Sequence, residues 1–294
     1  MDLDAFQRAA LVTDNTDRHY EGEESRKDLV VALLGIAGEL GTLATAYKKF
    51  LRDGPSYALY EDNVREELGD LLWYVAVLSD KFGLTLSAIA DANLQKTSGR
   101  WGTRLAEMHP PYDANYALEE QLPRRFEITF SEQLVEGKNK AVIELDGKPI
   151  GNSLTDNNQY EDGYRYHDAF HLGFATVLGW SPVIRKLMAR KRKSNQQVDE
   201  NEDGGRAIVI EEGIAAYIFD YGEDHDELRD VRAVDFDVLK TVKSMTHRLE
   251  VSSKNWGDWE RAIMAGWRIF RELKANGGGI VKCDLDAQEI VMVS

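Results

Sequence analysis

The chain has 294 residues, of which 51 are acidic and 36 basic, giving a formal net charge of -15 and a pI near 4.9. This balance disfavours a general affinity for nucleic-acid backbones or anionic membrane surfaces. A hydrophobic content of 43% can bury real cores and excludes wholesale disorder. The length suits two ordinary domains or one large one.

The cysteine content and the N-terminus indicate a compartment. Cys283 is the one cysteine, which excludes an intramolecular disulfide and a cysteine-based zinc cluster. The first residues lack the basic and apolar regions of a signal peptide. No apolar run approaches the roughly 20 residues that a membrane span needs. We expect a soluble, cytoplasmic protein without a membrane partner.

Residues 3–105 have a helical pattern of apolar side chains. The expected helices cover residues 4–12, 27–51, 63–82 and 87–97, and the second ends at Arg52-Asp53-Gly54-Pro55. Four helices with short connections predict a compact bundle, and we assign it residues 1–108. Residues 109–124 hold three of the six prolines and are predicted to form a linker.

Over residues 125–294 the pattern of apolar residues differs from that of the first part, which predicts a second domain. Alternating patterns at 126–130 and 141–145 indicate strands, with turn residues at Asp146-Gly147 and a closing hairpin over 280–284 and 289–293. Helical patterns follow at 163–178, 183–191, 208–219, 236–249 and 259–275, with a polar, acidic loop over 193–205. The predicted fold class is therefore mainly α: a four-helix bundle, then a mainly helical domain with a small antiparallel β element.

Two carboxylates stand out in the first part. Glu67 and Asp70 lie one turn apart on a helix whose next residues are apolar, and Glu39 lies on the preceding apolar helix. Acids close to a core usually have a partner, and a divalent cation is an economical one. The alternative is that these acids simply line the solvated side of the helix.

A third stretch completes the constellation. Asn93, Lys96 and Arg100 share one face of a helix that continues to residue 100. Acids on two helices and cations on a third suit a metal-bound polyphosphate, in which Mg²⁺ and basic groups share the phosphate charge.

These residues carry a family resemblance. Residues 29–101 resemble the MazG-like, all-α nucleoside triphosphate pyrophosphohydrolases, whose signature is E-x-x-E, a variable gap, E-x-x-D, and a downstream N-x-x-K-x-x-x-R. Glu39 matches the first acid, Glu67 and Asp70 the second pair, and Asn93, Lys96 and Arg100 the downstream element.

The resemblance implies an activity and a site. It implies that a (d)NTP, standard or modified, is cleaved between its α- and β-phosphates, with Mg²⁺ or Mn²⁺ as cofactor. Glu39, Glu67 and Asp70 would then hold metal and act in catalysis, and the downstream residues would bind substrate. It also implies a homodimer or a dimer of dimers.

One position departs from the family pattern. The second acid of the first pair is Thr42, whose hydroxyl can hold a water but brings no charge. Glu66, next to Glu67, is an imperfect substitute because it points about 100° away on the helix. An alternative function is therefore a nucleotide-binding or sensing protein with a degenerate site, whose second domain provides the output.

The second part contains another unusual cluster. His167 and His171 lie one turn apart, the spacing at which two imidazoles bind one metal, and Asp168 lies between them. Glu211 and Glu212 are candidates for a further ligand. The pattern does not match zinc peptidases, and the alternative is that these histidines are hydrogen-bonded core residues. This part also resembles the C-terminal domain attached to some MazG-like proteins, for which the family offers no established chemistry.

Overall fold

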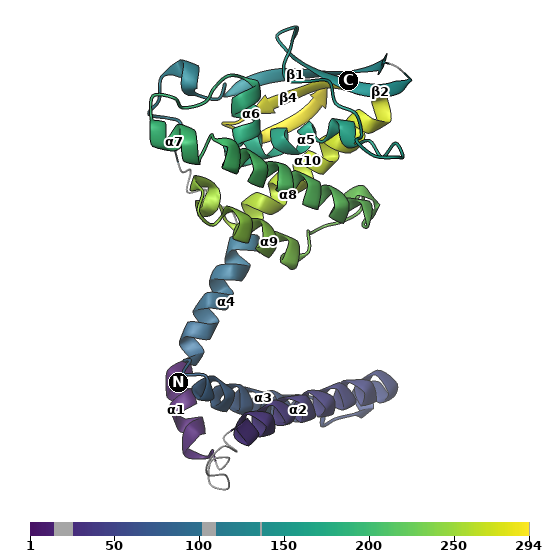
Figure 1. Cartoon of the computed structure of the whole chain (residues 1–294). Coiled ribbons are helices and arrows are strands. Elements are labelled where there is room, and N and C mark those ends of the chain that lie inside the picture. Colours follow the sequence, from purple (N-terminus) through teal and green to yellow (C-terminus); the bar gives the residue numbers. More distant parts are fainter. Residues whose placement is uncertain (15–25, 102–109, 136, 294) are drawn as a thin grey trace. The chain divides into compact units, whose positions relative to one another are not determined.

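The computed structural model describes residues 1–14, 26–101, 110–135 and 137–293, with the backbone alone for residues 26–28, 100 and 101 (Figure 1). The chain divides into two compact units, Met1–Thr97 and Ser98–Ser294. Each unit is described by itself.

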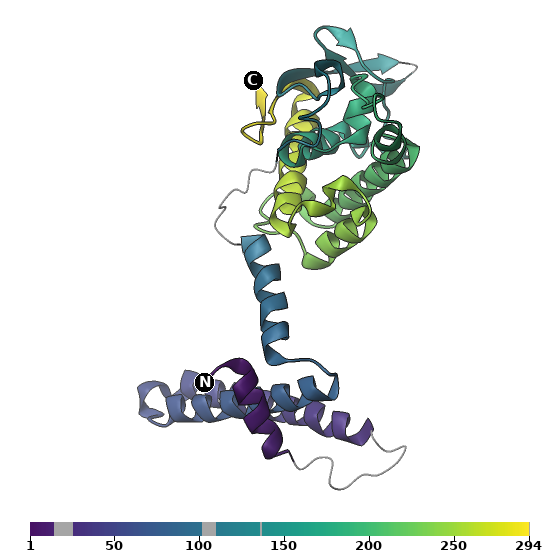
Figure 2. The same cartoon turned by 90° about the vertical axis from the view of Figure 1, so that its left-hand side faces the viewer.

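The first unit is built on a long helical hairpin. Helices α2 (Arg26–Asp53) and α3 (Tyr60–Lys81) lie side by side along their length, joined by a turn that contains the short helix η3 (Gly54–Ser56) (Figures 1 and 2). Helix α1 (Leu3–Val12) packs on α3. Gly54, with φ of +58°, allows the sharp reversal after α2.

The fourth helix leaves this hairpin. The side chain of Gln7 donates to the Leu84 carbonyl (3.0 Å) and accepts from the Leu86 amide (2.9 Å), which fixes the start of α4 (Leu86–Trp101) to α1. The axis bends by 102° between α3 and α4. The predicted helices are present, but α4 does not lie along α2 and α3 as the fourth member of a parallel-sided bundle would.

Helix α2 carries an exposed apolar face. Its outward side chains recur at helical spacing and include Val30, Leu33, Leu34, Leu40, Tyr47 and Leu51. The helix Leu29–Ser56 is long and apolar enough to cross a membrane by length and composition, and 11% of its most apolar window is buried. The expectation that no segment is long and apolar enough to cross a membrane is wrong. Single glycines and Glu39 interrupt the apolar residues of α2, but the mean hydropathy of the helix stays high enough to meet the criterion.

The second unit contains an antiparallel sheet in the order β3-β2-β1-β4-β5. The strands are β1 (Arg125–Val135), β2 (Lys138–Leu145), β3 (Lys148–Pro149), β4 (Gly278–Asp284) and β5 (Glu289–Val293). The pairing of β1 with β4 joins the beginning of the unit to its end, with Ile128 opposite Val281. Alternating burial along both strands buries one face of the sheet.

The helices of the unit lie on the side of that buried face (Figure 1). They are α5 (Asp168–Gly173), which continues as a π-turn (Phe174–Leu178), α6 (Pro182–Leu187), α7 (Gln196–Asn201), α8 (Gly205–Glu223), α9 (Phe236–Thr246) and α10 (Trp256–Asn276). Of these, α10 is in direct contact with β4 and β5. Short 3₁₀ turns lie at Leu118–Glu120, Tyr164–Tyr166, Asp226–Leu228 and Glu250–Ser253. The predicted fold class, mainly α with a small antiparallel β element, is confirmed.

Helices α5 and α10 cross at the centre of the core. Both helices have a glycine at the crossing: a Cβ on Gly173 would lie 2.8 Å from the backbone oxygen of Ala262 and 3.1 Å from the Gly266 nitrogen. Trp259, Trp267 and Phe270 on α10 are completely buried around this point. The close approach therefore sets how α5 lies in the unit.

Two segments expected to be loose are packed into the second unit. In the predicted linker, residues 110–124, the carboxylate of Asp113 is 1% exposed and contacts Arg185 (2.7 Å) and Arg124 (2.5 Å). The predicted loop over 193–205 is wrong for its middle part, because Gln196–Asn201 form α7. Asp203, after this helix, pairs with the buried Arg192 (2.7 Å). Both segments are polar in composition, but their acidic side chains are neutralised by arginines that are buried or far away in the sequence.

Candidate functional site

Two acids of the first unit, Glu39 and Glu67, approach each other in the seam between α2 and α3. Glu39 lies on the face of α2 that also carries Ala32 and Ala46, seven residues away on either side and both buried. Glu67 is half-buried on α3, and its carboxyl group makes a hydrogen-bond contact with Glu39. The second oxygen of Glu67, Oε2, is buried and has no hydrogen-bond partner.

This arrangement concentrates negative charge. Burial raises the pKa of Glu67, and the contact with Glu39 and the charges of Glu39, Glu66 and Asp70 raise that pKa further. Two carboxylates in contact cannot both be ionised at low cost unless a proton or a cation lies between them. The seam is therefore chemically suited to receive a cation.

The other acidic and hydroxyl candidates lie around the seam. Asp70 and Glu66 are exposed on α3 and act on Glu67 through their charge. Thr42 is exposed on α2, and its hydroxyl donates to the Gly38 carbonyl at 3.3 Å, within its own helix. Its hydroxyl is thus engaged with the backbone in this structure.

The cationic candidates are not brought to the acids within the first unit. Asn93 and Lys96 are exposed on α4, beyond the 102° bend that separates α4 from α3. The side chain of Arg100 lies outside the described residues. Of the predicted site, the described part of the first unit brings Glu39 close to Glu67, and α4 turns away from that seam. The shared site of Glu39, Glu67, Asp70, Asn93, Lys96 and Arg100 stays a prediction.

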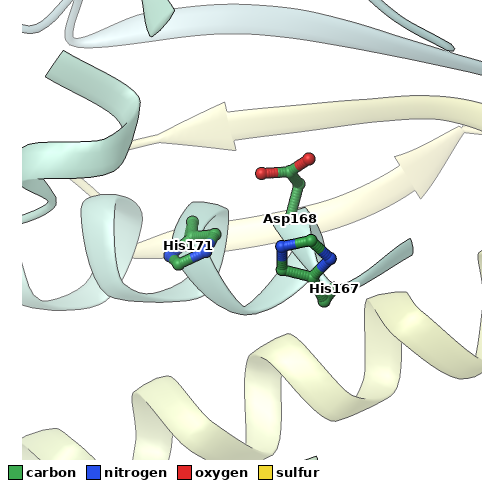
Figure 3. Close-up of side chains that lie close together, drawn as sticks. All are labelled: His167, Asp168 and His171. Atoms are coloured by element: carbon green, nitrogen blue, oxygen red, sulfur yellow. The ribbon is translucent and has the colours of Figure 1, made fainter. Parts of the chain in front are cut away.

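The second cluster forms between α5 and α8. His171 is completely buried, and its Nδ1 lies 2.8 Å from Oε1 of the equally buried Glu211. His171 Nε2 lies 3.3 Å from Oε2 of Glu212, and His167 Nε2 lies 3.6 Å from the same oxygen. The two histidines and Glu212 thus face one another, as the sequence spacing predicted for the histidine pair. Figure 3 shows how the two imidazoles and Asp168 lie on the helix.

Asp168 is the third acidic member. It is 5% exposed, and one ligand atom from each of His167, Asp168 and His171 lies within 4.8 Å of the others. With Glu211 and Glu212 on α8, the cluster contains two imidazoles and three carboxylates. It opens toward solvent through Glu212, whose side chain is 44% exposed.

The charged groups of this cluster shift one another's pKa values strongly. Burial acts to lower the pKa of His171, but the charge and hydrogen bond of Glu211, together with Glu212, outweigh it and raise that pKa to about 10. Contacts with His167 and His171 hold the pKa of Glu212 well below its usual range. Without a metal, the cluster is therefore an ion-paired group that keeps His171 protonated.

Several residues that position the cluster were not predicted. Glu211 accepts from the Ser181 hydroxyl (2.6 Å) and from the Val183 amide (2.8 Å), so both of its oxygens are fixed. The ring of Tyr164 stacks on His167 with centroids 4.5 Å apart. Tyr164 lies three residues before His167, which was a usable local signal, whereas Ser181 is separated from Glu211 by thirty residues and gave none.

Comparison with known proteins bears on the second unit. A family model described as the MazG C-terminal domain matches residues 107–294, which is more than half of the chain. The chain belongs to the MazG C-terminal domain family. The predicted relationship of residues 125–294 to MazG-associated proteins is thereby confirmed, whereas the resemblance of residues 29–101 to MazG-like pyrophosphohydrolases stays a prediction.

A phage protein is also similar. The Gene 37 protein of Mycobacterium phage L5 is 35% identical over 103 residues, which cover 34% of this chain and 89% of the phage protein. No solved structure matches this chain.

Proposed function

We propose that the first unit is a Mg²⁺-dependent nucleoside triphosphate pyrophosphohydrolase, which converts a (d)NTP into its monophosphate and pyrophosphate. The observation that carries the proposal is the contact of Glu39 with Glu67, whose Oε2 is buried without a partner. The presence of a MazG C-terminal domain in the same chain supports it, because that domain is named for this group of proteins.

The residues of the seam fit a magnesium ion. Mg²⁺ prefers carboxylate oxygens, and a cation beside Glu67 would offset the burial and the repulsion that raise its pKa. Glu39, Glu67 and Asp70 would hold the ion, with Glu66 as an alternative ligand. When bound, Mg²⁺ or Mn²⁺ neutralises phosphate charge and activates water.

The substrate residues require a second copy of the chain in this proposal. Asn93, Lys96 and Arg100 would contact phosphate or sugar, but the bend after α3 carries the described part of α4 away from the seam of its own unit. We propose that a homodimer or tetramer, formed through the apolar face of α2, supplies them from a neighbouring copy. The net charge of -15 makes an anionic bilayer a poor partner for that face.

A panel of standard and modified (d)NTPs with Mg²⁺ or Mn²⁺, scored for pyrophosphate, tests the activity. We expect Glu67→Gln and Asp70→Asn to lower the rate at least about 10²-fold, as changes at metal sites do. Glu61→Gln is the matched control, because Glu61 is an exposed acid in the first turn of the same helix. Full activity in both site variants would overturn the assignment.

A second function is favoured by Thr42. The family pattern has an acid at this position, so the seam has one acid fewer. The Thr42 hydroxyl donates to the Gly38 carbonyl and does not replace the missing charge. The alternative proposal is a nucleotide sensor that binds without efficient turnover. Calorimetry would then show Mg²⁺-dependent nucleotide binding without pyrophosphate release, and Thr42→Glu would gain activity. A Thr42→Glu variant that gains nothing would contradict the account of a degenerate site.

A further inference from the structure

We propose that His167, His171 and Glu212 bind a divalent transition-metal ion in the second unit, with Asp168 available as a fourth ligand. The inference is independent of the proposed hydrolase site, because it rests on other residues in the other unit. It assigns a metal of the zinc type, for which imidazole nitrogen and carboxylate oxygen are suitable ligands.

The hydrogen bonds of the two histidines leave the same ring nitrogen available on each. His167 Nδ1 lies 2.9 Å from the Tyr164 carbonyl, which can only accept, so this nitrogen donates. His171 Nδ1 lies 2.8 Å from the Glu211 carboxylate and donates in the same way. In the neutral histidines, both Nε2 atoms therefore carry a lone pair.

The distances around Glu212 fit a shared ion better than hydrogen bonds. His171 Nε2 is buried and makes no hydrogen bond of acceptable geometry, although Glu212 Oε2 lies 3.3 Å away. The distance from His167 Nε2 to the same oxygen is 3.6 Å. Ligands on a tetrahedral metal with bonds of about 2.1 Å lie about 3.4 Å apart. Each of the two nitrogens therefore lies from Glu212 Oε2 at close to the separation that two ligands of a common ion would have.

The surroundings also resemble the outer layer of a metal site. A metal-binding histidine usually donates its other N–H to a carboxylate or carbonyl, which fixes its tautomer and orientation. Glu211 does this for His171 and is itself held by Ser181 and Val183. Tyr164 does it for His167 and also stacks on its ring. Both imidazoles are thus oriented before any ion binds.

The cluster is accessible to an ion on one side. His171 is completely buried and His167 is 8% exposed, whereas the side chain of Glu212 is 44% exposed. An ion can therefore enter past Glu212. A carboxylate that closes the site from the surface suits a site that exchanges its metal with solution.

The test is metal binding by the full chain in the presence of excess Mg²⁺, which occupies the carboxylate seam of the first unit. We expect Zn²⁺ to copurify or bind tightly, and Co²⁺ to give the visible absorption bands of a low-coordinate site with nitrogen ligands. His167→Gln and Glu212→Gln should weaken binding at least about 10²-fold and remove the Co²⁺ bands. These two positions are used because changing His171 would leave the buried Glu211 carboxylate without its ion-pair partner.

The controls are His247→Gln and Glu200→Gln, which remove an exposed histidine and an exposed acid of the same unit. Both should keep the affinity and the spectrum of the unchanged chain. Wild-type protein that binds neither Zn²⁺ nor Co²⁺ would overturn the proposal and identify the cluster as a protonated ion pair. Binding that survives in His167→Gln and Glu212→Gln would overturn it as well.

Discussion

At the level of single residues, Glu67 is the least favourably placed acid of the first unit. Its carboxyl group touches Glu39, is close to Glu66 and Asp70, and has one buried oxygen without a partner. The raised pKa means that the folded protein binds this proton more tightly than the unfolded chain does. The charge of Glu67 therefore destabilises the fold as pH rises from its ordinary pKa of 4.5 through the raised value.

Glu67→Gln should consequently stabilise the hairpin of α2 and α3 at neutral pH when divalent ions are chelated. Amide hydrogen exchange of α3 should slow in the variant under these conditions, and the difference should vanish below the ordinary pKa. Mg²⁺ should slow exchange in the wild-type chain but not in the variant. Glu61→Gln, on the same helix, should respond to Mg²⁺ as the wild type does. If α3 exchanges faster in Glu67→Gln than in the wild type when divalent ions are chelated, the proposed repulsion at Glu67 is contradicted.

At the level of elements, the crossing of α5 and α10 depends on the absence of a side chain at Gly173. Gly173→Ala would bring a methyl group to 2.8 Å from the Ala262 backbone oxygen, so one helix must move. We expect a loss of about 1–3 kcal/mol in the free energy of unfolding, as for other overpacked cores. Urea unfolding measures it.

The matched control for this crossing is Gly205→Ala at the start of α8, where an added Cβ meets nothing within 4 Å. Its unfolding midpoint should stay close to that of the wild type. Equal midpoints for the two variants would show that the close approach of α5 and α10 contributes nothing to stability.

Elements with local patterns were predictable from the sequence, and long-range partners were not. The alternation in β1 and β2 was visible in each strand, and β4 was expected in a closing hairpin. The pairing of Ile128 with Val281 was not visible, because it joins residues more than 150 positions apart. The spacing of His167 and His171 predicted that they face one way, and Glu212 on α8 was a correct candidate neighbour. The burial of Asp113 and Asp203 was missed, because their arginine partners are not marked by any local pattern.

The seam was predicted more fully than its surroundings. Glu39 and Glu67 belong to helices joined by a short turn, which places the two helices side by side. The apolar period of α2 did not show which face meets α3, because its larger apolar side chains, such as Leu33 and Leu34, are exposed. The direction of α4 depends instead on the hydrogen bonds of Gln7 and Asp4 at its start. These contacts have no periodic signal, and the position of Asn93 and Lys96 therefore could not be read from the chain.

For the whole molecule, the exposed apolar face of α2 is the surface through which we propose that the chain self-associates. Leu34 is 66% exposed and lies among other outward apolar residues on the face opposite Glu39. Leu34→Glu should shift the full chain from dimer or tetramer to monomer in analytical ultracentrifugation, because a charge in an apolar interface is costly.

The control for self-association is Leu134→Glu, since Leu134 is 74% exposed on β1 in the second unit. It should leave the oligomeric state unchanged. A wild-type chain that stays monomeric, or that binds lipid vesicles through α2 instead, would contradict a second copy as the occupant of this face.

The most direct measurement of the central claim is the identity of the products that the full chain forms from a (d)NTP with Mg²⁺. The proposed cleavage between the α- and β-phosphates predicts monophosphate and pyrophosphate in equal amounts, with no product when the metal is chelated. Release of orthophosphate and a nucleoside diphosphate, or no Mg²⁺-dependent product from any (d)NTP of the panel, would contradict the claim that the Glu39–Glu67 seam is the centre of a pyrophosphohydrolase.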